Sequence, residues 1–530
     1  MKFPIGIQSF ERIITEGYVY VDKTDLVYRL THEGSIYFLS RPRRFGKSLL
    51  VSTLENYFLG KKELFKGLAL EKLETEWKTY PVFHVDFNGP NFTEPDALVK
   101  NLHTFVRNQE EKYSVMPEPE QELSDRFLKV LAEARRQTGM RCVILVDEYD
   151  KPLLDVMDTG YTVDCGGNVM TIEERNRNIL KAFYSTFKKA DDDLQFVFLT
   201  GVTKFSQISV FSGFNQPDDI SMTEEYDAIC GITDDELDQY FGERVEALAA
   251  KESVSREIMR DILRKRYDGY HFSEALHGVY NPFSLLHVFK YLSIKDYWFE
   301  SGTPTYLVRL LEHFDEDINE LTSELYDRSQ FVDYRANKEL PLPMIFQSGY
   351  LTIKSYNRRK EKYILDFPND EVRRGFITAV ASNYFKSQKK LGSLIDNLVD
   401  ALDEADLEKF HVSLTAFLAS VPYTSRRSSG EHEMERYFHL TFYLILRLIS
   451  TYTIFTEKCQ SQGRVDCVIE TDKFIYIFEF KLNGTAQQAI DQIESQGYAK
   501  EYASDLRKLF KIGCSFSSET GTIGDFSVKD

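Results

Sequence analysis

Three adjacent residues near the start of the chain have the types and the spacing needed to grip a phosphate. Gly46, Lys47 and Ser48 follow an apolar run, residues 35–39, and precede an amphipathic segment that extends to Phe58. In a strand, loop and helix of this kind, loop N–H groups cradle phosphate oxygens, the lysine neutralises their charge and the serine hydroxyl binds Mg²⁺. The segment predicts a P-loop for ATP. An ordinary basic loop that caps a helix is the alternative.

One position departs from the usual P-loop pattern, which has a glycine six residues before the lysine. Arg41 stands at that position. A bulky side chain beside the phosphates would interfere with the chemistry there. The sequence therefore predicts nucleotide binding and leaves open whether ATP is hydrolysed or only bound.

A second run, CVILVDEYD, has the character of a buried strand that ends in acids. Asp147 at the tip of such a strand can hold Mg²⁺, and Glu148 can polarise the attacking water. The strand at 196–200 ends in threonine, and Thr200 and Thr203 are candidates to sense the γ-phosphate or position water. Threonine at a strand end also serves as a cap or turn residue.

The order of elements supports this interpretation. Strand-like runs alternate with helix-like segments up to about residue 215, which predicts an α/β domain with a parallel sheet and helices on both faces. The strands are expected at 35–39, 82–87, 142–146 and 196–200, and the helices at 48–58, 96–112, 124–138 and 172–190. Residues 216–375 are predicted to form a helical lid or winged-helix region, and a third module follows at 376–530.

Two strand-like runs in the third module, within GRVDCVIETDKFIYIFEFKL, flank a polar turn. If that turn is a four-residue loop, Asp466 lies opposite Ile477, and the two-residue period places Asp466, Glu479 and Lys481 on one face. Two carboxylates and a lysine can hold a divalent metal and stabilise a phosphorane, as phosphodiester hydrolysis requires. A solvated face of an ordinary sheet is the alternative.

Other polar side chains flank this hairpin. The preceding helix offers Glu435 as a further acid, and His439, four residues on, is either part of the site or half of a surface pair. A basic loop is expected at 425–430. Gln492 and Tyr498, on the helix after the hairpin, are candidates to contact substrate or to order the lysine.

Composition limits the class of protein. The chain has 530 residues, 42% of them hydrophobic, and a net charge of −18, so nonspecific coating of nucleic acid is excluded and any such contact needs a local basic groove. The six cysteines form no CxxC pair and indicate reduced thiols. No apolar run has the length of a signal peptide core or a membrane span, so a soluble cytoplasmic protein is expected.

Several phrases together resemble one bacterial family. They are YVDKT, RPRRFGKS, LVDEYDKP, LTGVTKFS, YDGYHF and YNPFS, in this order over most of the chain. The sequence is similar to bacterial AAA-ATPase-like proteins, whose members often carry a C-terminal PD-(D/E)XK nuclease-like domain, and the arginine-rich loop is usual among them.

The resemblance implies particular roles. Gly46, Lys47 and Ser48 take Walker A roles, and Asp147 and Glu148 take Walker B roles. Arg43 or Arg44 serves as a charge clamp or forms an ion pair with Asp150, and both options stay open. The nucleotide-contacting set becomes Arg44, Phe45, Gly46, Lys47, Ser48, Leu49 and Thr200, with Ser48, Asp147, Asp466 and Glu479 as metal ligands and Glu148, Asp466, Glu479 and Lys481 as catalytic residues.

The predicted protein is an ATPase whose nucleotide state controls a Mg²⁺-dependent nuclease acting on DNA or RNA. An alternative is a nucleotide-regulated interaction protein whose nuclease-like domain binds a partner without cutting. A third option is a plain ATPase with a DNA-binding winged helix, but the middle region contains no basic recognition helix. ATPases of this kind often assemble into rings, and the sequence does not determine the oligomeric state.

Overall fold

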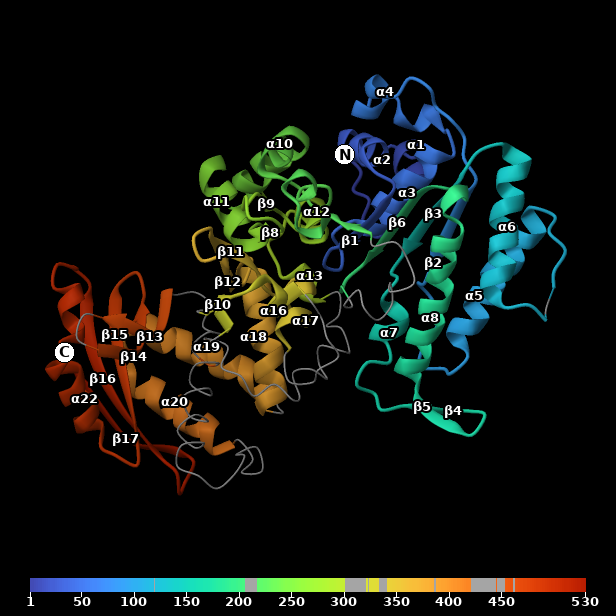
Figure 1. The fold of residues 1–530 in the computed structure, drawn as a ribbon. Coiled ribbons are helices and arrows are strands. Elements are labelled where there is room, and N and C mark those ends of the chain that lie inside the picture. Colours follow the sequence, from blue (N-terminus) through green and yellow to red (C-terminus); the bar gives the residue numbers. More distant parts are fainter. Residues whose placement is uncertain are drawn as a thin grey trace. The chain divides into compact units, whose positions relative to one another are not determined.

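The structure is a computed structural model. It describes residues 1–118, 120–204, 217–300, 321–322, 324–332, 341–385, 388–420, 445, 453–460 and 463–530. The chain divides into two compact units (Figure 1). The first comprises Met1–Phe314 and Glu320–Val372, and the second comprises Asp315–Asn319 and Arg373–Asp530. No helix among the described residues has the length and apolarity that a membrane span requires.

A five-stranded parallel sheet forms the centre of the first unit, in the order β2-β3-β6-β1-β7. Its strands are β1 (Ile36–Ser40), β2 (Val82–Asp86), β3 (Cys142–Asp147), β6 (Leu194–Gly201) and β7 (Asp218–Asp219). Every residue of β3 is buried, as expected for a central parallel strand covered on both faces. The predicted parallel α/β fold is confirmed.

Helices connect these strands (Figure 1). Helix α3 packs against β2, β3 and β6, while α6 contacts β3 and packs with α5 and α8. These helices are α1 (Phe10–Thr15), α2 (Thr24–Glu33), α3 (Lys47–Phe58), α4 (Ala69–Leu73), α5 (Ala97–Lys112), α6 (Leu123–Thr138), α7 (Lys151–Leu154) and α8 (Ile172–Lys189). A two-stranded ribbon, β4 (Thr162–Cys165) and β5 (Asn168–Thr171), lies between α7 and α8 in the chain.

The middle of the chain belongs to this same compact unit. Its core joins α10 (Asp234–Lys251), α11 (Arg256–Tyr267) and α12 (Pro282–Tyr291), and Phe3 from the N-terminal segment packs against it. The region is not purely helical, because it also contains two small sheets. These are β8 (Tyr270–His271) with β9 (Gly278–Val279), and β10 (Leu325–Tyr326), β12 (Lys362–Asp366) and β11 (Thr352–Asn357). Short helices α13 (Tyr297–Glu300), α16 (Arg328–Val332) and α17 (Leu342–Gln347) complete it.

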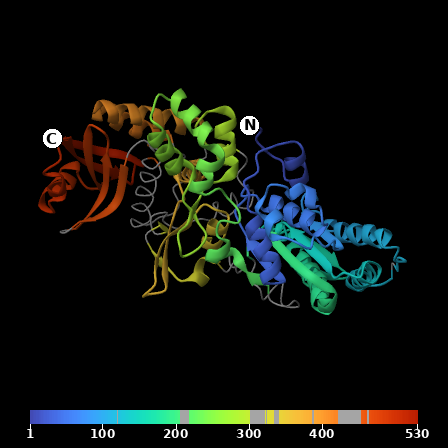
Figure 2. The same cartoon turned by 90° about the horizontal axis from the view of Figure 1, so that it is seen from above.

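The second unit contains another five-stranded sheet (Figure 2). Its strands, in spatial order, are β13 (Thr453–Gln460), β14 (Gly463–Glu470), β15 (Phe474–Leu482), β16 (Lys508–Ser517) and β17 (Thr522–Lys529). Only β15 and β16 pair in parallel, and α22 (Ala486–Ser495) makes the crossover between them. Helices α19 (Gln388–Glu404) and α20 (Leu407–Ser420) pack together, and α18 (Asp370–Phe385) precedes them.

Candidate functional site

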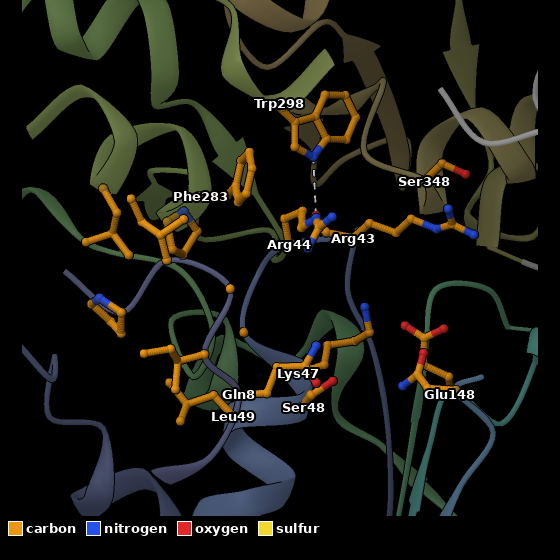
Figure 3. Close-up of a pocket in the computed structure, with 18 of the residues that line it drawn as sticks. Gln8, Arg43, Arg44, Lys47, Ser48, Leu49, Glu148, Phe283, Trp298 and Ser348 are labelled. Atoms are coloured by element: carbon orange, nitrogen blue, oxygen red, sulfur yellow. Dashed lines mark hydrogen bonds between the residues drawn. The ribbon is translucent and has the colours of Figure 1, made fainter. Parts of the chain in front are cut away.

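A cavity of about 380 Å³ opens above the start of α3 (Figure 3). This volume is in the range of small-molecule sites. Four parts of the first unit line the cavity: the N-terminal segment, the loop before α3, the carboxyl end of β3 and the middle region. The lining residues are Pro4, Ile5, Gly6, Ile7, Gln8, Arg43, Arg44, Gly46, Lys47, Ser48, Leu49, Asn88, Glu148, Lys151, Pro282, Phe283, Leu286, Trp298, Ser348 and Tyr350.

The predicted phosphate-gripping residues lie together on one wall of this cavity. Gly46 has φ of 96°, a left-handed conformation that glycine adopts without steric cost, and α3 begins directly after it. Lys47 is buried, and its Nζ donates hydrogen bonds to the carbonyl oxygens of Arg41 at 3.1 Å and Pro42 at 3.2 Å. The loop thus curls around its own lysine, as a phosphate cradle requires.

Of the two acids at the end of β3, Glu148 lines the cavity, and Asp147 is buried and does not line it. Burial raises the pKa of Asp147, while a hydrogen bond from Ser48 and the charge of Lys47 oppose that rise. The Ser48 hydroxyl and the Lys47 ammonium are thus close enough to Asp147 to act on its charge, and a hydroxyl near a carboxylate suits Mg²⁺. Glu148, with φ of 51°, lines the cavity beside them (Figure 3).

Other predicted nucleotide contacts lie elsewhere. Phe45 is buried with its ring against Tyr270 at 4.7 Å and does not line the cavity, because it anchors the loop to the middle region. Thr200 is fully buried, and its hydroxyl donates to the Leu39 carbonyl at 2.8 Å, tying β6 to β1. Neither side chain therefore lines the cavity, whereas Leu49 does.

Arg41 does not crowd the cavity. Its side chain is buried and turned into the protein, where the guanidinium donates to the carbonyl oxygens of Ser221 at 2.8 Å and Tyr226 at 3.0 Å. It also lies 4.1 Å from the centre of the Phe272 ring, and burial lowers its pKa to about 10. Arg41 therefore holds the loop in place, and the predicted obstruction beside the phosphates is not found.

The two remaining arginines of the loop differ in direction. The guanidinium of Arg44 lies 5.0 Å from the Phe283 ring centre, and Arg43 extends toward Ser348 on the side of Glu148 (Figure 3). Neither is paired with Asp150. That buried carboxylate instead accepts from the N–H groups of Val202 and Thr203 and from the Thr203 hydroxyl, and burial raises its pKa to about 6. Thr203 thus orders the end of β3 and does not line the cavity.

The second candidate site lies on the β14–β15 hairpin, whose register differs from the prediction. Cys467 pairs with Phe478, and the Thr471 N–H donates to the Phe474 carbonyl, so the turn has two residues and not four. The correct register brings Asp466 opposite Glu479 in place of Ile477. Because the error is two residues, it preserves the face of every side chain, and the predicted convergence holds.

Contacts on this face order a lysine and leave a carboxylate oxygen available. Lys481 Nζ lies 3.5 Å from Glu479 Oε1 and 2.5 Å from Gln492 Oε1. Asp466 Oδ2 accepts from the Phe480 N–H at 2.8 Å. Glu479 Oε2 is buried without a hydrogen-bond partner, and burial together with the charge of Asp466 raises the Glu479 pKa to about 7. A buried, unpartnered carboxylate oxygen beside a second acid suits a divalent cation.

The other predicted members of this site are placed only in part. Gln492 accepts from the lysine, and Tyr498, which begins the 3-10 turn after α22, is buried in the core cluster with residues of α22, β14 and β15. Glu435, His439 and the 425–430 loop lie outside the described residues. Among the residues that are described, no group of three or more histidine, cysteine or acidic side chains is arranged to hold a metal.

Two regions of the chain match known protein families. Residues 4–211 match the family described as Predicted AAA-ATPase, and residues 433–526 match the PD-(D/E)XK nuclease superfamily. The chain is 33% identical over 534 residues to an uncharacterized protein in the vnfD 5′ region of Azotobacter chroococcum mcd 1, covering 100% of this chain and 99% of that protein. The chain belongs to this AAA-ATPase-like family with a C-terminal PD-(D/E)XK domain.

A solved structure also matches, at lower similarity. It is the Aeropyrum pernix ORC1 protein in complex with DNA, with 13% identity and a TM-score of 0.25, over 70% of this chain and 96% of that one. Nothing further about this AAA-ATPase-like protein follows from so distant a likeness.

The walls of the cavity that face the start of α3 could not be identified from the sequence. Pro4 to Gln8, Phe283, Trp298 and Tyr350 line it, although they are remote from the loop in sequence. Phe283 belongs to the phrase YNPFS, which by its residue types indicates no particular chemistry. The N-terminal segment carried no signal, because its place beside α3 depends on its packing against the helical middle.

Proposed function

We propose that the first unit binds and hydrolyses ATP with Mg²⁺, and that the second unit uses a divalent metal to cut nucleic acid phosphodiesters under control of the nucleotide. The nearness of the Asp147 carboxylate to Ser48 and Lys47, which both line the cavity, carries the first half of the proposal. The unpartnered Glu479 oxygen beside Lys481 supports the second half.

In the ATPase half, Lys47 would exchange the loop carbonyls for phosphate oxygens. Ser48 and Asp147 would hold Mg²⁺, which neutralises charge on the β- and γ-phosphates when bound. Glu148 would take a proton from the attacking water as the water oxygen bonds to the γ-phosphorus and the bridging oxygen leaves on ADP. Arg43, which extends toward the Glu148 side, would stabilise charge on the γ-phosphate (Figure 3).

In the nuclease half, Asp466 and Glu479 would hold the metal, which lowers the pKa of bound water when present. Lys481, held by Gln492, would donate a hydrogen bond to the phosphate oxygen that gains charge. Water adds to phosphorus and the ester oxygen departs with a proton. The competing proposal is that this unit retains the fold and binds a partner without cutting.

Calorimetry with ATP and Mg²⁺ tests the ATPase half. Wild type should bind, Lys47→Ala should lose at least tenfold in affinity, and Glu148→Gln should bind ATP without releasing phosphate. Lys66→Ala, at an exposed lysine of the same unit, is the matched control and should behave as wild type. Absence of binding by the wild type would overturn the proposal.

A cleavage assay on single- and double-stranded DNA and RNA tests the nuclease half. Lys481→Ala should abolish cleavage while the unfolding temperature stays within the range of the wild type. Lys473→Ala, at the exposed turn of the same hairpin, is the control and should cut normally. Partner or nucleic acid binding that survives in every variant, with cleavage seen in none, would favour the interaction protein.

A further inference from the structure

A buried carboxylate outside both sites is connected to the nucleotide cavity. Glu371 is 1% exposed, near the start of α18, and accepts two hydrogen bonds from neutral donors. The Trp298 N–H reaches its Oε1 at 2.8 Å, and the Ser284 hydroxyl reaches its Oε2 at 2.7 Å. No ion pair to Glu371 exists among the described residues. Since a buried charge normally has a charged partner, this arrangement needs an explanation.

One donor lines the cavity and the other is next in sequence to a lining residue. Trp298 lines the cavity, and its indole Nε1 donates to the Arg43 carbonyl at 3.3 Å (Figure 3). Ser284 follows Phe283, another wall residue, on α12. Glu371 therefore accepts a hydrogen bond from the backbone of Trp298, and the Trp298 indole in turn binds the P-loop.

Trp298 and Lys47 hold consecutive carbonyls of the same loop. Lys47 binds those of Arg41 and Pro42, and Trp298 binds that of Arg43. Lys47 must release its two carbonyls when it takes a phosphate. The Trp298 contact is then the hydrogen bond that keeps this side of the loop in position.

The charge state of Glu371 sets the strength of its hydrogen bond from Trp298. A carboxylate is a charged acceptor for both donors, whereas a protonated carboxyl accepts from the Trp298 N–H with a neutral oxygen and turns its hydroxyl toward Ser284, so the bond from Trp298 is weaker. Burial raises the Glu371 pKa to about 7, with Asp296 raising it further and Arg266 opposing. The titratable groups facing it are Arg266 and Tyr267 on α11, Tyr270 on β8 and Asp296 before α13.

We propose that Glu371 is a positioning residue for the nucleotide site: its carboxylate holds Trp298 against the Arg43 carbonyl and so keeps the P-loop ready to bind. This rests on the proposed ATP site. Nucleotide binding and deprotonation of Glu371 then favour each other, because each stabilises the same loop arrangement. Glu371 is also in the first turn of α18, whose residues from Arg373 onward belong to the second unit.

Fluorescence of a single tryptophan tests the proposal. The chain has only two tryptophans, so Trp77→Phe leaves Trp298 as the sole reporter in the otherwise intact protein. Its emission should change between pH 6 and 8 even without nucleotide. Glu371→Gln should remove that change, because glutamine can accept from Trp298 and donate to the Ser284 oxygen without titrating.

ATP affinity measured over the same pH range is the second readout. In the Trp77→Phe chain it should strengthen as the pH rises, by a few-fold. Glu371→Gln should give a pH-independent affinity near the wild-type value at low pH, and Glu371→Ala should weaken binding further, on the order of tenfold below the wild-type maximum. This contrast between glutamine and alanine separates positioning from a general packing role.

The outcomes are separable. If the Glu371→Gln chain keeps the emission change, or if its affinity follows the wild-type pH profile, the proposal is wrong. If the wild type binds no ATP at any pH, the proposed function fails, and an intact pH response of Trp298 in the free protein would still support the hydrogen-bond network but not its role in binding. A Glu371→Ala chain that binds ATP as tightly as wild type would also overturn the proposal.

Discussion

At the residue scale, burial of Glu479 suits metal binding but destabilises the metal-free fold when the carboxyl ionises. Its pKa of about 7 lies above the ordinary value of 4.5 because the side chain is buried beside Asp466. Between these two pH values the folded carboxyl retains a proton that the unfolded chain would release. The stability of the second unit in chelator should therefore fall as the pH rises from about 4.5 to 7.

Glu479→Gln should remove this loss. We expect the variant to be about 2 kcal/mol more stable than wild type at pH 8 in chelator, and equally stable at pH 4.5. Denaturant unfolding at the two pH values measures the difference. Glu519→Gln, on the exposed turn before β17, is the control. An equal gain for both variants would show that burial of Glu479 is not the cause.

Two arginines of one loop should have opposite phenotypes. Arg41→Lys removes a buried fork of hydrogen bonds that an ammonium group cannot reproduce, and should cost about 3 kcal/mol of stability. Arg43→Lys, at the cavity, should leave the unfolding temperature unchanged and slow phosphate release at least tenfold. Thermal unfolding and phosphate release measured on both variants decide between these roles, and reversed phenotypes would refute the assignment.

At the element scale, the P-loop is held by segments that pack against it from the middle region. Gly349, after α17, has φ of 86°, and a Cβ added there would lie 2.6 Å from Pro42 Cγ. Gly349→Ala should therefore displace the loop and weaken ATP binding on the order of tenfold.

Gly167 supplies the matched control for this substitution. Its φ is 93° and an added Cβ would meet nothing within 4 Å, so Gly167→Ala carries the backbone cost of about 1 kcal/mol without the clash. Both variants should lose stability in thermal unfolding, Gly349→Ala more than Gly167→Ala because of the clash. Calorimetry should show weakened ATP binding for Gly349→Ala alone, and equal affinities would mean that contact with Pro42 does not matter.

The positions of the central strands of the first unit could be predicted from the sequence. The strands β1, β2, β3 and β6 begin and end within two residues of the predicted runs, because apolar alternation and the acids at strand ends mark their limits. The length of the turn between β14 and β15 could not be predicted. Alternation specifies which face a side chain takes, but a two-residue error in turn length leaves that pattern unchanged.

At the scale of the whole molecule, the two compact units should unfold separately. Scanning calorimetry should show two transitions. ATP with Mg²⁺ at about 100 times Kd should add about 2.7 kcal/mol to the free energy of unfolding of the unit that binds it. The temperature of one transition should therefore rise, and Lys47→Ala should abolish that rise. Mn²⁺ without nucleotide should raise the other, and Asp466→Asn should abolish that shift. A single transition that moves with both ligands would mean that the units unfold as one.

The sequence by itself determined the chemistry available to each unit. The P-loop with Ser48, the acids of β3 and the hairpin triad of Asp466, Glu479 and Lys481 are each set by local order along one or two elements, and local order is what periodicity and spacing encode.

Only the tertiary structure decided where Arg41 and Phe45 point, that Thr200 is used within the sheet, and that Pro4 to Gln8, Phe283 and Trp298 close the cavity. Each depends on packing between segments far apart in the chain. The direction of a long side chain follows from which neighbours can satisfy its polar atoms once the core has formed, and those neighbours are not adjacent in sequence.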